Sequence, residues 1–202
     1  GGFTREADFR PDLPTPFSNH RDMIYLNSSA KCDPHLLTLL VHEFTHAVAF
    51  SVRSSDGAHR ALPAEDDWLN EAIAHVSENL NGSDWTNLDY RISRFLSAPN
   101  EYPLVVENYY QSGMWRNHGC RGATYLFLRW CADQYGERLP YKLIRSPVHG
   151  ARSLEWATGE RFEELFRRWT IALYQSGRFA DSLRADRPTG DTNRPAREPK
   201  AE

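Results

Sequence analysis

Hydrophobic residues recur at helical spacing along most of this 202-residue chain, and the pattern is strongest just after residue 33. Asp33 is a suitable N-cap, and Pro34 suits the first position of a helix, where its missing N–H group does no harm. The helix is predicted to end near Val52. Its apolar residues surround the helix axis, which predicts a buried element. They are Leu36, Leu37, Leu39, Leu40, Val41, Phe44, Val48, Phe50 and Val52.

Four more helices are predicted downstream, at residues 67–80, 84–96, 122–136 and 160–175. The first of these has Asp66 or Asp67 as its N-cap and stops at Asn81-Gly82, a common C-terminal signal. A short, apolar and β-prone segment at residues 22–29 predicts a strand. The expected fold class is therefore mainly α, an α+β fold with a small strand element N-terminal to the first helix.

Three segments lack such a pattern. Residues 1–19 are polar and punctuated by proline, and residues 53–64 are typical of a surface loop. From residue 181 onward the chain has almost no apolar residues, which predicts disorder. We therefore expect one domain over residues 1–180 and a disordered C-terminal tail at residues 181–202. Because the chain opens with GGFT rather than Met, we expect a processed or expressed product whose signal peptide, if any, has been removed.

The composition of the chain bears on whether it binds nucleic acids or membranes. A net charge of −3 and a pI near 6.3, with no basic stripe, give no support for nucleic-acid binding or adhesion to an anionic membrane. No apolar run reaches the roughly 18 residues that span a bilayer. Cys120 and Cys131 are expected about 16 Å apart along one helix, too far for a disulfide. Cys32 could pair with either, but three free thiols are the expectation.

The first predicted helix contains HEFTH at residues 42–46. Residues four apart lie on one helix face about 6 Å apart, so His42 and His46 can bind one tetrahedral Zn²⁺. Glu43 is turned by about 100° around the axis, and it can reach a metal-bound water without being a ligand. The alternative is a pair of core histidines that are hydrogen-bonded to backbone or solvent.

The next helix offers a third ligand, Glu71, in the segment WLNEAIAHVSE. Its polar stripe, with spacings of 3, 4 and 3, consists of Trp68, Glu71, His75 and Glu78. A separate apolar stripe, which is predicted to pack on the first helix, consists of Leu69, Ile73, Val76 and Leu80. The alternative is a solvated face that merely carries Glu71 and Glu78.

HEFTH followed by WLNE resembles the gluzincin metallopeptidases, and it is most similar to the hyicolysin-type neutral metallopeptidases over roughly residues 18–175. The resemblance implies a zincin-like catalytic domain with one catalytic Zn²⁺ held by His42, His46 and Glu71. Glu43 would be the general base for a metal-activated water that attacks a peptide carbonyl. The resemblance also implies a secreted or extracytoplasmic protein that acts on peptides or proteins.

The chain departs from the family pattern at three points. Ala72 replaces a usual Gly. His75 stands where several gluzincins have an acidic residue that orients the first histidine, so Glu78 is the candidate for that support. Arg121-Gly122 replaces a usual Tyr-Gly, which leaves the donor for the transition state to be found elsewhere.

For that donor we select His118, with Tyr110 second and His149 a more distant choice; each of them is also plausible as an ordinary surface residue. The leading function is a zinc endopeptidase. An aminopeptidase-like exopeptidase is the alternative that W-L-N-E suggests, although the chain has no G-x-M-E-N segment and fewer than 45 residues precede the motif. A catalytically silent, zinc-binding protein-interaction domain is the other alternative, which an intact Glu43 disfavours.

Overall fold

The computed structural model describes residues 1–54, 61–82, 84–114 and 117–185. It divides into two compact units, Gly1–Leu165 and Phe166–Glu202. The described part of the second unit consists of the remainder of the last helix, in which the Phe166 and Trp169 rings lie 5.9 Å apart. The described residues are mainly helical, as the sequence predicts.

The elements run in the order strand, helix, strand and then helices only. They are β1 (Gly2–Thr4), η1 (Glu6–Phe9), β2 (Ile24–Leu26), α1 (Pro34–Ser54), α2 (Asp67–Asn81), α3 (Thr86–Ser97), η2 (Pro99–Glu101), α4 (His118–Tyr135), α5 (Leu139–Ile144), α6 (Ala151–Thr158) and α7 (Phe162–Ala185). The predicted strand near residues 22–29 is β2, and all five predicted helices are present.

The sequence prediction was wrong at several short elements. Residues 1–19, expected to be irregular, contain β1 and η1, and the helices α5 and α6 were not predicted. These elements have three to eight residues each, too few for a periodic pattern to emerge. The last helix continues to Ala185, past the expected start of the tail, and residues 186–202 lie outside the described residues.

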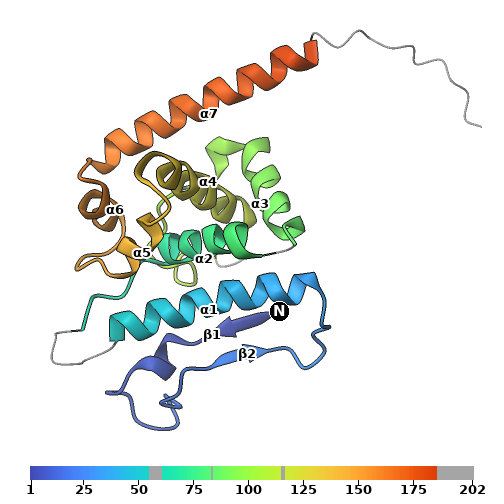
Figure 1. Cartoon of the computed structure of the whole chain (residues 1–202). Helices are drawn as coiled ribbons and strands as arrows, with labels where there is room; N and C mark the ends of the chain where they lie inside the picture. The colour runs from blue at the N-terminus through green and yellow to red at the C-terminus, as the bar shows by residue number, and fades with distance from the viewer. Residues whose placement is uncertain (55–60, 83, 115–116, 186–202) are drawn as a thin grey trace, which may run out of the picture. The chain divides into compact units, whose positions relative to one another are not determined.

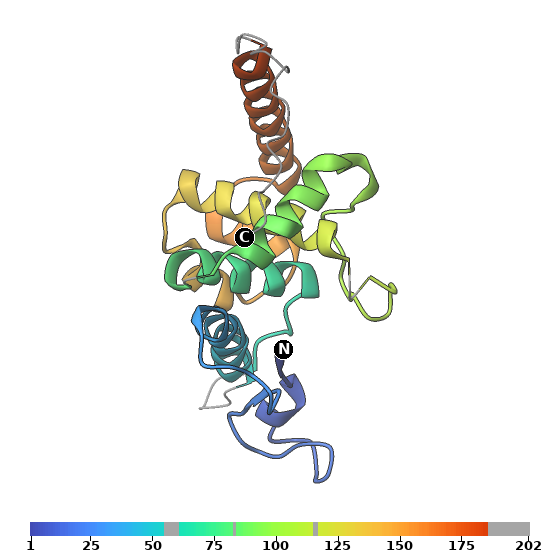
Figure 2. The same cartoon turned by 90° about the vertical axis from the view of Figure 1, so that its right-hand side faces the viewer.

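The helices of the first unit lie in successive layers above a small sheet (Figures 1 and 2). Strands β1 and β2 are antiparallel, with Phe3 opposite Tyr25, and β1 packs along α1. Helix α2 packs between α1 and α4, and α3 packs on α4. Trp68, Leu69 and Ile73 of α2 are fully buried. Leu80, which was predicted in one apolar stripe with Leu69 and Ile73, is instead about half exposed because it lies in the last turn of the helix.

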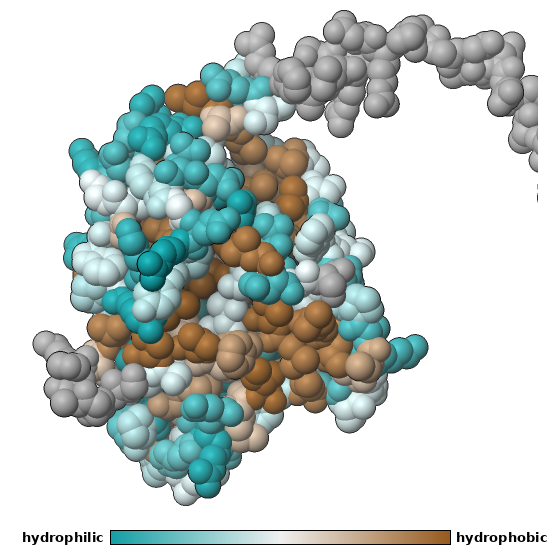
Figure 3. Space-filling model, in the orientation of Figure 1, coloured by the Kyte–Doolittle hydropathy of each residue, from teal (hydrophilic) through white to brown (hydrophobic). Residues whose placement is uncertain are grey.

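Helix α1 is less buried than its sequence predicts. Leu37, Phe44 and Val48 are 50%, 62% and 37% exposed, and they share one face of the helix. Figure 3 shows apolar residues gathered in a band at the level of α1. Among the described residues, α1 is also the one helix that is long and apolar enough, by length and composition, to cross a membrane. Core helices meet the same criterion, and α1 packs against protein on both its β1 and its α2 sides.

All three cysteines are free, as expected, with Cys120 and Cys131 buried in α4 and Cys32 exposed. Burial raises the pKa of the Cys120 thiol to about 11, so it stays protonated at neutral pH. None of them lines the cavity described below.

A hydrogen-bond network around Asp8 joins η1 to β2 within the N-terminal segment. The buried Asp8 carboxylate accepts hydrogen bonds from Tyr25 Oη at 2.6 Å and from the Asn19 backbone N–H at 3.0 Å. Burial raises the pKa of Asp8, but these hydrogen bonds and the nearby Arg5 outweigh it and leave the pKa lowered. The Tyr25 ring also stacks on Phe3 at 4.7 Å. The network therefore fixes β1 against its neighbours.

Tyr25→Phe removes one donor to Asp8 while keeping the stacked ring. We expect the free energy of unfolding to fall by about 1.5–3 kcal/mol at neutral pH, the usual contribution of a hydrogen bond to a charged group. Since the pKa of Asp8 is lowered in the folded protein, this contribution is present at neutral pH and is lost as the pH falls through that pKa. Urea unfolding at pH 7 and pH 3 measures both effects. Tyr110→Phe, at a side chain that is 80% exposed, is the control and should change little.

Candidate metal centre

Helices α1 and α2 bring three metal-ligating side chains together. His42 and His46 are four residues apart on α1, and their Nε2 atoms lie 3.1 Å from each other. Glu71 of α2 places Oε2 3.5 Å from His42 Nε2 and Oε1 3.9 Å from His46 Nε2. Both histidines are buried and the Glu71 side chain is 16% exposed. These are the three ligands that the sequence predicts, and they could hold a metal ion.

The spacing of these donor atoms agrees with tetrahedral coordination. Bonds of about 2.0–2.1 Å from a metal to nitrogen or oxygen place neighbouring donors of a tetrahedron roughly 3.3 Å apart. The observed separations of 3.1, 3.5 and 3.9 Å bracket that value. Among the described residues, Glu71 Oε2 is buried without a well-aligned hydrogen bond, although the Arg121 guanidinium is near. The residues therefore fit a metal ion.

The hydrogen bonds orient His42 for metal binding. His42 Nδ1 lies 2.5 Å from Glu78 Oε1, so the ring donates from Nδ1 and directs Nε2 to the proposed metal position. Burial lowers the pKa of His42, but the hydrogen bond to Glu78 and the nearby carboxylates outweigh it and leave the pKa raised, so a metal at Nε2 would take the place of a proton. Burial and the neighbouring His42 ring lower the pKa of His46 to about 4, so His46 is neutral at physiological pH. Burial raises the pKa of Glu71, but the positive charge of Arg121 and the nearby histidine rings outweigh it, so the pKa is lowered and the carboxylate stays ionised.

A second group, made of His42, His75 and Glu78, is close enough together to hold a metal but is already hydrogen-bonded. His75 Nδ1 lies 2.9 Å from Glu78 Oε1, and Arg91 Nη1 lies 2.6 Å from His75 Nε2. Both nitrogens of His75 are thereby engaged, and Arg91 adds a positive charge. Burial and Arg91 lower the pKa of His75 to about 4. We interpret this group as support for the first one, with Glu78 in the orienting role that the sequence predicts for it.

Glu43 lies on α1 beside the two histidines, but its carboxylate is directed to β1. Thr4 Oγ1 is 3.1 Å from Glu43 Oε2 and 3.0 Å from the Glu43 backbone carbonyl, which accepts its hydrogen bond. Burial raises the pKa of Glu43, against the opposing effects of His42 and Thr4. The pKa is thus moved toward neutrality, as suits a group that takes up and releases a proton.

These groups open onto a cavity of about 470 Å³. His118 and Tyr110, the two preferred donors from the sequence, also line it. His118 is exposed at the start of α4, but partial shielding of its ring from water, together with the charges of Arg91 and Arg121, lowers its pKa. His149, the more distant choice, does not line this cavity and pairs with Asp66 at 2.7 Å instead.

The cavity is also lined by Arg121, Thr4 and Arg91, which were not selected from the sequence. Arg121 Nη1 lies 3.1 Å from Glu71 Oε2, and its guanidinium is 5.6 Å from the Tyr109 ring centre. Arg121 stands where the resemblance noted in the sequence led us to expect a tyrosine, and that difference was the available signal. Thr4 and Arg91 belong to elements that the motifs do not include, so no sequence signal placed them near His42.

A scan against models of protein families found no match, and neither a search of curated proteins nor a search of solved structures found a similar protein. The interpretation of the site therefore depends on its geometry and on the motifs.

Glu78→Gln tests the support for His42. The amide can still accept a hydrogen bond but lacks the charge that favours donation from His42 Nδ1, so we expect the affinity for Zn²⁺ to fall about 10- to 100-fold. Chelator competition on the purified protein measures it. Glu101→Gln, at an exposed residue of η2, is the matched control and should bind as the unmodified protein does. Equal affinities for both variants would assign Glu78 no part in metal binding.

Proposed function

We propose that this protein is a zinc-dependent endopeptidase with a zincin-like catalytic domain in its first unit. The observation that carries the proposal is the convergence of His42, His46 and Glu71, with Glu43 beside them, at one cavity. The donor set of two neutral imidazoles and one carboxylate is typical of catalytic zinc, which retains an open coordination position.

Zinc, when bound by these three residues, supplies Lewis-acid chemistry that polarises a carbonyl group and lowers the pKa of water. Glu43 accepts a proton from the attacking water and then delivers it to the amine that leaves. Burial raises the pKa of Glu43, which makes it a stronger base than an exposed carboxylate. Thr4 Oγ1 lies 3.1 Å from Glu43 Oε2, on the β1 side of the cavity.

The edge of β1 gives the cavity a means of binding a peptide. Gly1 O accepts a hydrogen bond from the Asn27 N–H at 3.0 Å, so Gly1 faces β2. In an antiparallel ladder alternate residues face the partner strand, and Gly2 and Thr4 therefore direct their N–H and C=O groups to the opposite edge. Among the described residues no strand pairs with that edge. Gly2 and Thr4 both line the cavity, where an extended peptide can add a strand.

Stabilisation of the transition state needs a donor across the cavity from Glu43. His118 remains our proposal from the sequence, and Arg121 is the alternative that its 3.1 Å approach to Glu71 favours. Single substitutions separate them, because the donor is the residue whose loss lowers kcat without lowering zinc content. Removal of one such donor commonly costs a factor of about 10²–10³ in kcat.

Glu43→Gln tests the proposed chemistry. The amide cannot accept the proton, so we expect cleavage of unfolded casein to fall by about 10²–10⁴, the usual contribution of a general base. Zinc content and thermal unfolding should stay unchanged, since Glu43 is not a ligand. Glu137→Gln, on the exposed surface, serves as the control. Undiminished cleavage by Glu43→Gln would exclude this mechanism, and a folded, zinc-loaded protein without any activity would favour a silent binding domain.

Paired peptides distinguish an endopeptidase from an exopeptidase. We expect the same internal bond to be cut in a peptide with a free amino terminus and in its acetylated counterpart, with mass spectrometry identifying the products. The reason is that the free edge of β1 recognises backbone rather than a terminal amine. Stepwise removal of residues from the free amino terminus alone would show the aminopeptidase-like alternative to be correct.

A further inference from the structure

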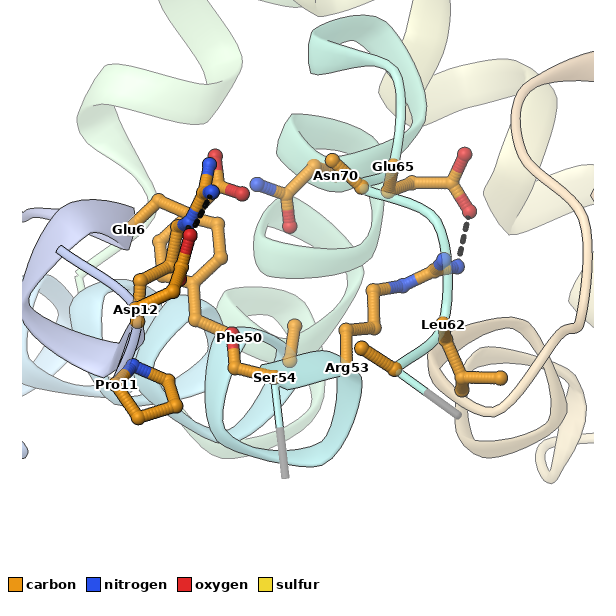
Figure 4. Close-up of a pocket in the computed structure, with 13 residues that line it drawn as sticks. Glu6, Pro11, Asp12, Phe50, Arg53, Ser54, Leu62, Glu65 and Asn70 are labelled. Atoms are coloured by element: carbon orange, nitrogen blue, oxygen red, sulfur yellow. Dashed lines mark hydrogen bonds and ion pairs between the residues drawn. The ribbon is translucent and has the colours of Figure 1, made fainter. Parts of the chain in front are cut away.

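A second cavity of about 400 Å³ adjoins the candidate metal centre. It lies between the C-terminal half of α1 and the segment that contains η1, and it is bounded by Phe50 and Asn70, which also line the metal cavity. Figure 4 shows Asn70 above this space, with Phe50 and Arg53 rising from α1 below it. A molecule bound along the metal cavity can therefore extend into the second one.

The direction of β1 determines which end of a bound peptide meets this second cavity. β1 runs alongside α1 in the same direction, since Thr4 contacts Glu43 and Glu6 lies further along at the cavity that Arg53 lines. Antiparallel pairing is slightly more stable per residue than parallel pairing. A peptide antiparallel to β1 directs its N-terminal side toward Glu6. The second cavity is thus placed to receive a side chain on the N-terminal side of the scissile bond.

The inner wall of the second cavity carries a closed ion pair. Arg53 Nη2 lies 2.6 Å from Glu65 Oε2 and donates to the Leu143 carbonyl at 3.0 Å. Glu65 also accepts hydrogen bonds from the Gly150 N–H at 2.5 Å and from Ser153 Oγ at 3.0 Å. The side chains of Arg53 and Glu65 are both buried, and their opposite charges cancel. Their hydrogen bonds fix the inner wall of the second cavity.

The described residues at the outer rim of the second cavity carry more negative than positive charge. Arg10 makes two hydrogen bonds to Asp12, at 3.1 and 2.6 Å, which neutralises both. Glu6 is exposed and near enough to Arg10 and Arg53 to interact electrostatically, but the described residues offer it no ion pair within 4 Å. Because two arginines face three carboxylates among the described lining residues, those residues together carry one net negative charge. Its apolar walls are Pro11, Ala49, Phe50, Ala61, Leu62 and Ala64.

We propose that this second cavity binds a lysine or arginine side chain of the substrate, located within the few residues N-terminal to the scissile bond. The aliphatic stem packs against Phe50 and Leu62, and the cationic head meets Glu6 at the rim. The inference rests on the proposed peptidase function and specifies its substrate class as peptides with a basic residue at that position.

The test uses three peptides that are identical except at a single position on the N-terminal side of the cleaved bond. That position carries lysine, its uncharged analogue norleucine, or glutamate. Their dissociation constants are measured on zinc-loaded Glu43→Gln by fluorescence anisotropy, and kcat/KM is measured on the unmodified protein. We expect the lysine peptide to bind about fivefold more tightly than norleucine, which is the upper end for an exposed ion pair. Glu6→Gln should remove the difference, and Glu6→Lys should favour glutamate. Glu137→Gln should retain the original order.

Two outcomes would overturn the inference in different ways. If the peptides are cleaved without a preference for lysine, or if the preference survives in folded Glu6→Gln, the second cavity is not the binding site for a basic side chain, and the peptidase function stands. If no peptide is bound by Glu43→Gln or cleaved by the unmodified protein, the proposed function fails together with the inference. Thermal unfolding of each variant verifies that Glu6, an exposed residue, has been replaced without loss of the fold.

Discussion

The hydrogen bond from His42 Nδ1 to Glu78 Oε1, at 2.5 Å, is the interaction on which the rest of the site depends. It joins α1 to α2 and fixes the tautomer of His42, so that the other nitrogen faces His46 and Glu71. Both partners are buried, and removing one partner of a buried charged pair commonly costs about 3–5 kcal/mol. The same contact therefore holds the two helices in register and determines which nitrogen is left to bind a metal.

Charge balance explains how so many ionisable groups are tolerated between two helices. The carboxylates of Glu71 and Glu78 lie near the guanidinium groups of Arg121 and Arg91, with histidine rings between them. Burial raises the pKa of both glutamates, but these neighbours outweigh it, and the carboxylates stay ionised. A buried carboxylate without such partners would be protonated and a poor ligand. Arg91 also engages His75, which leaves His42, His46 and Glu71 as the group with lone pairs available.

The sequence predicted the parts of the site that depend on local helical spacing and little else. The four-residue interval placed His42 and His46 together, and the next amphipathic helix supplied Glu71. Thr4 could not be predicted, since β1 has three residues and is defined by its contacts with β2 and α1. Apolar periodicity also overstated the burial of α1, because a pattern of apolar residues does not reveal whether a partner covers each face. Arg121 reached the site through the packing of α4 on α2, which no local pattern encodes.

The central claim, that His42, His46 and Glu71 form one metal centre, is tested most directly by X-ray absorption at the zinc edge on the zinc-loaded protein. The account predicts about one tightly bound zinc per chain, with two imidazole nitrogens and one carboxylate at bond lengths of about 2.0–2.2 Å. Glu71→Ala should lose the carboxylate signal and most of the metal. A protein that binds no zinc, or whose zinc environment is unchanged in Glu71→Ala, would contradict it.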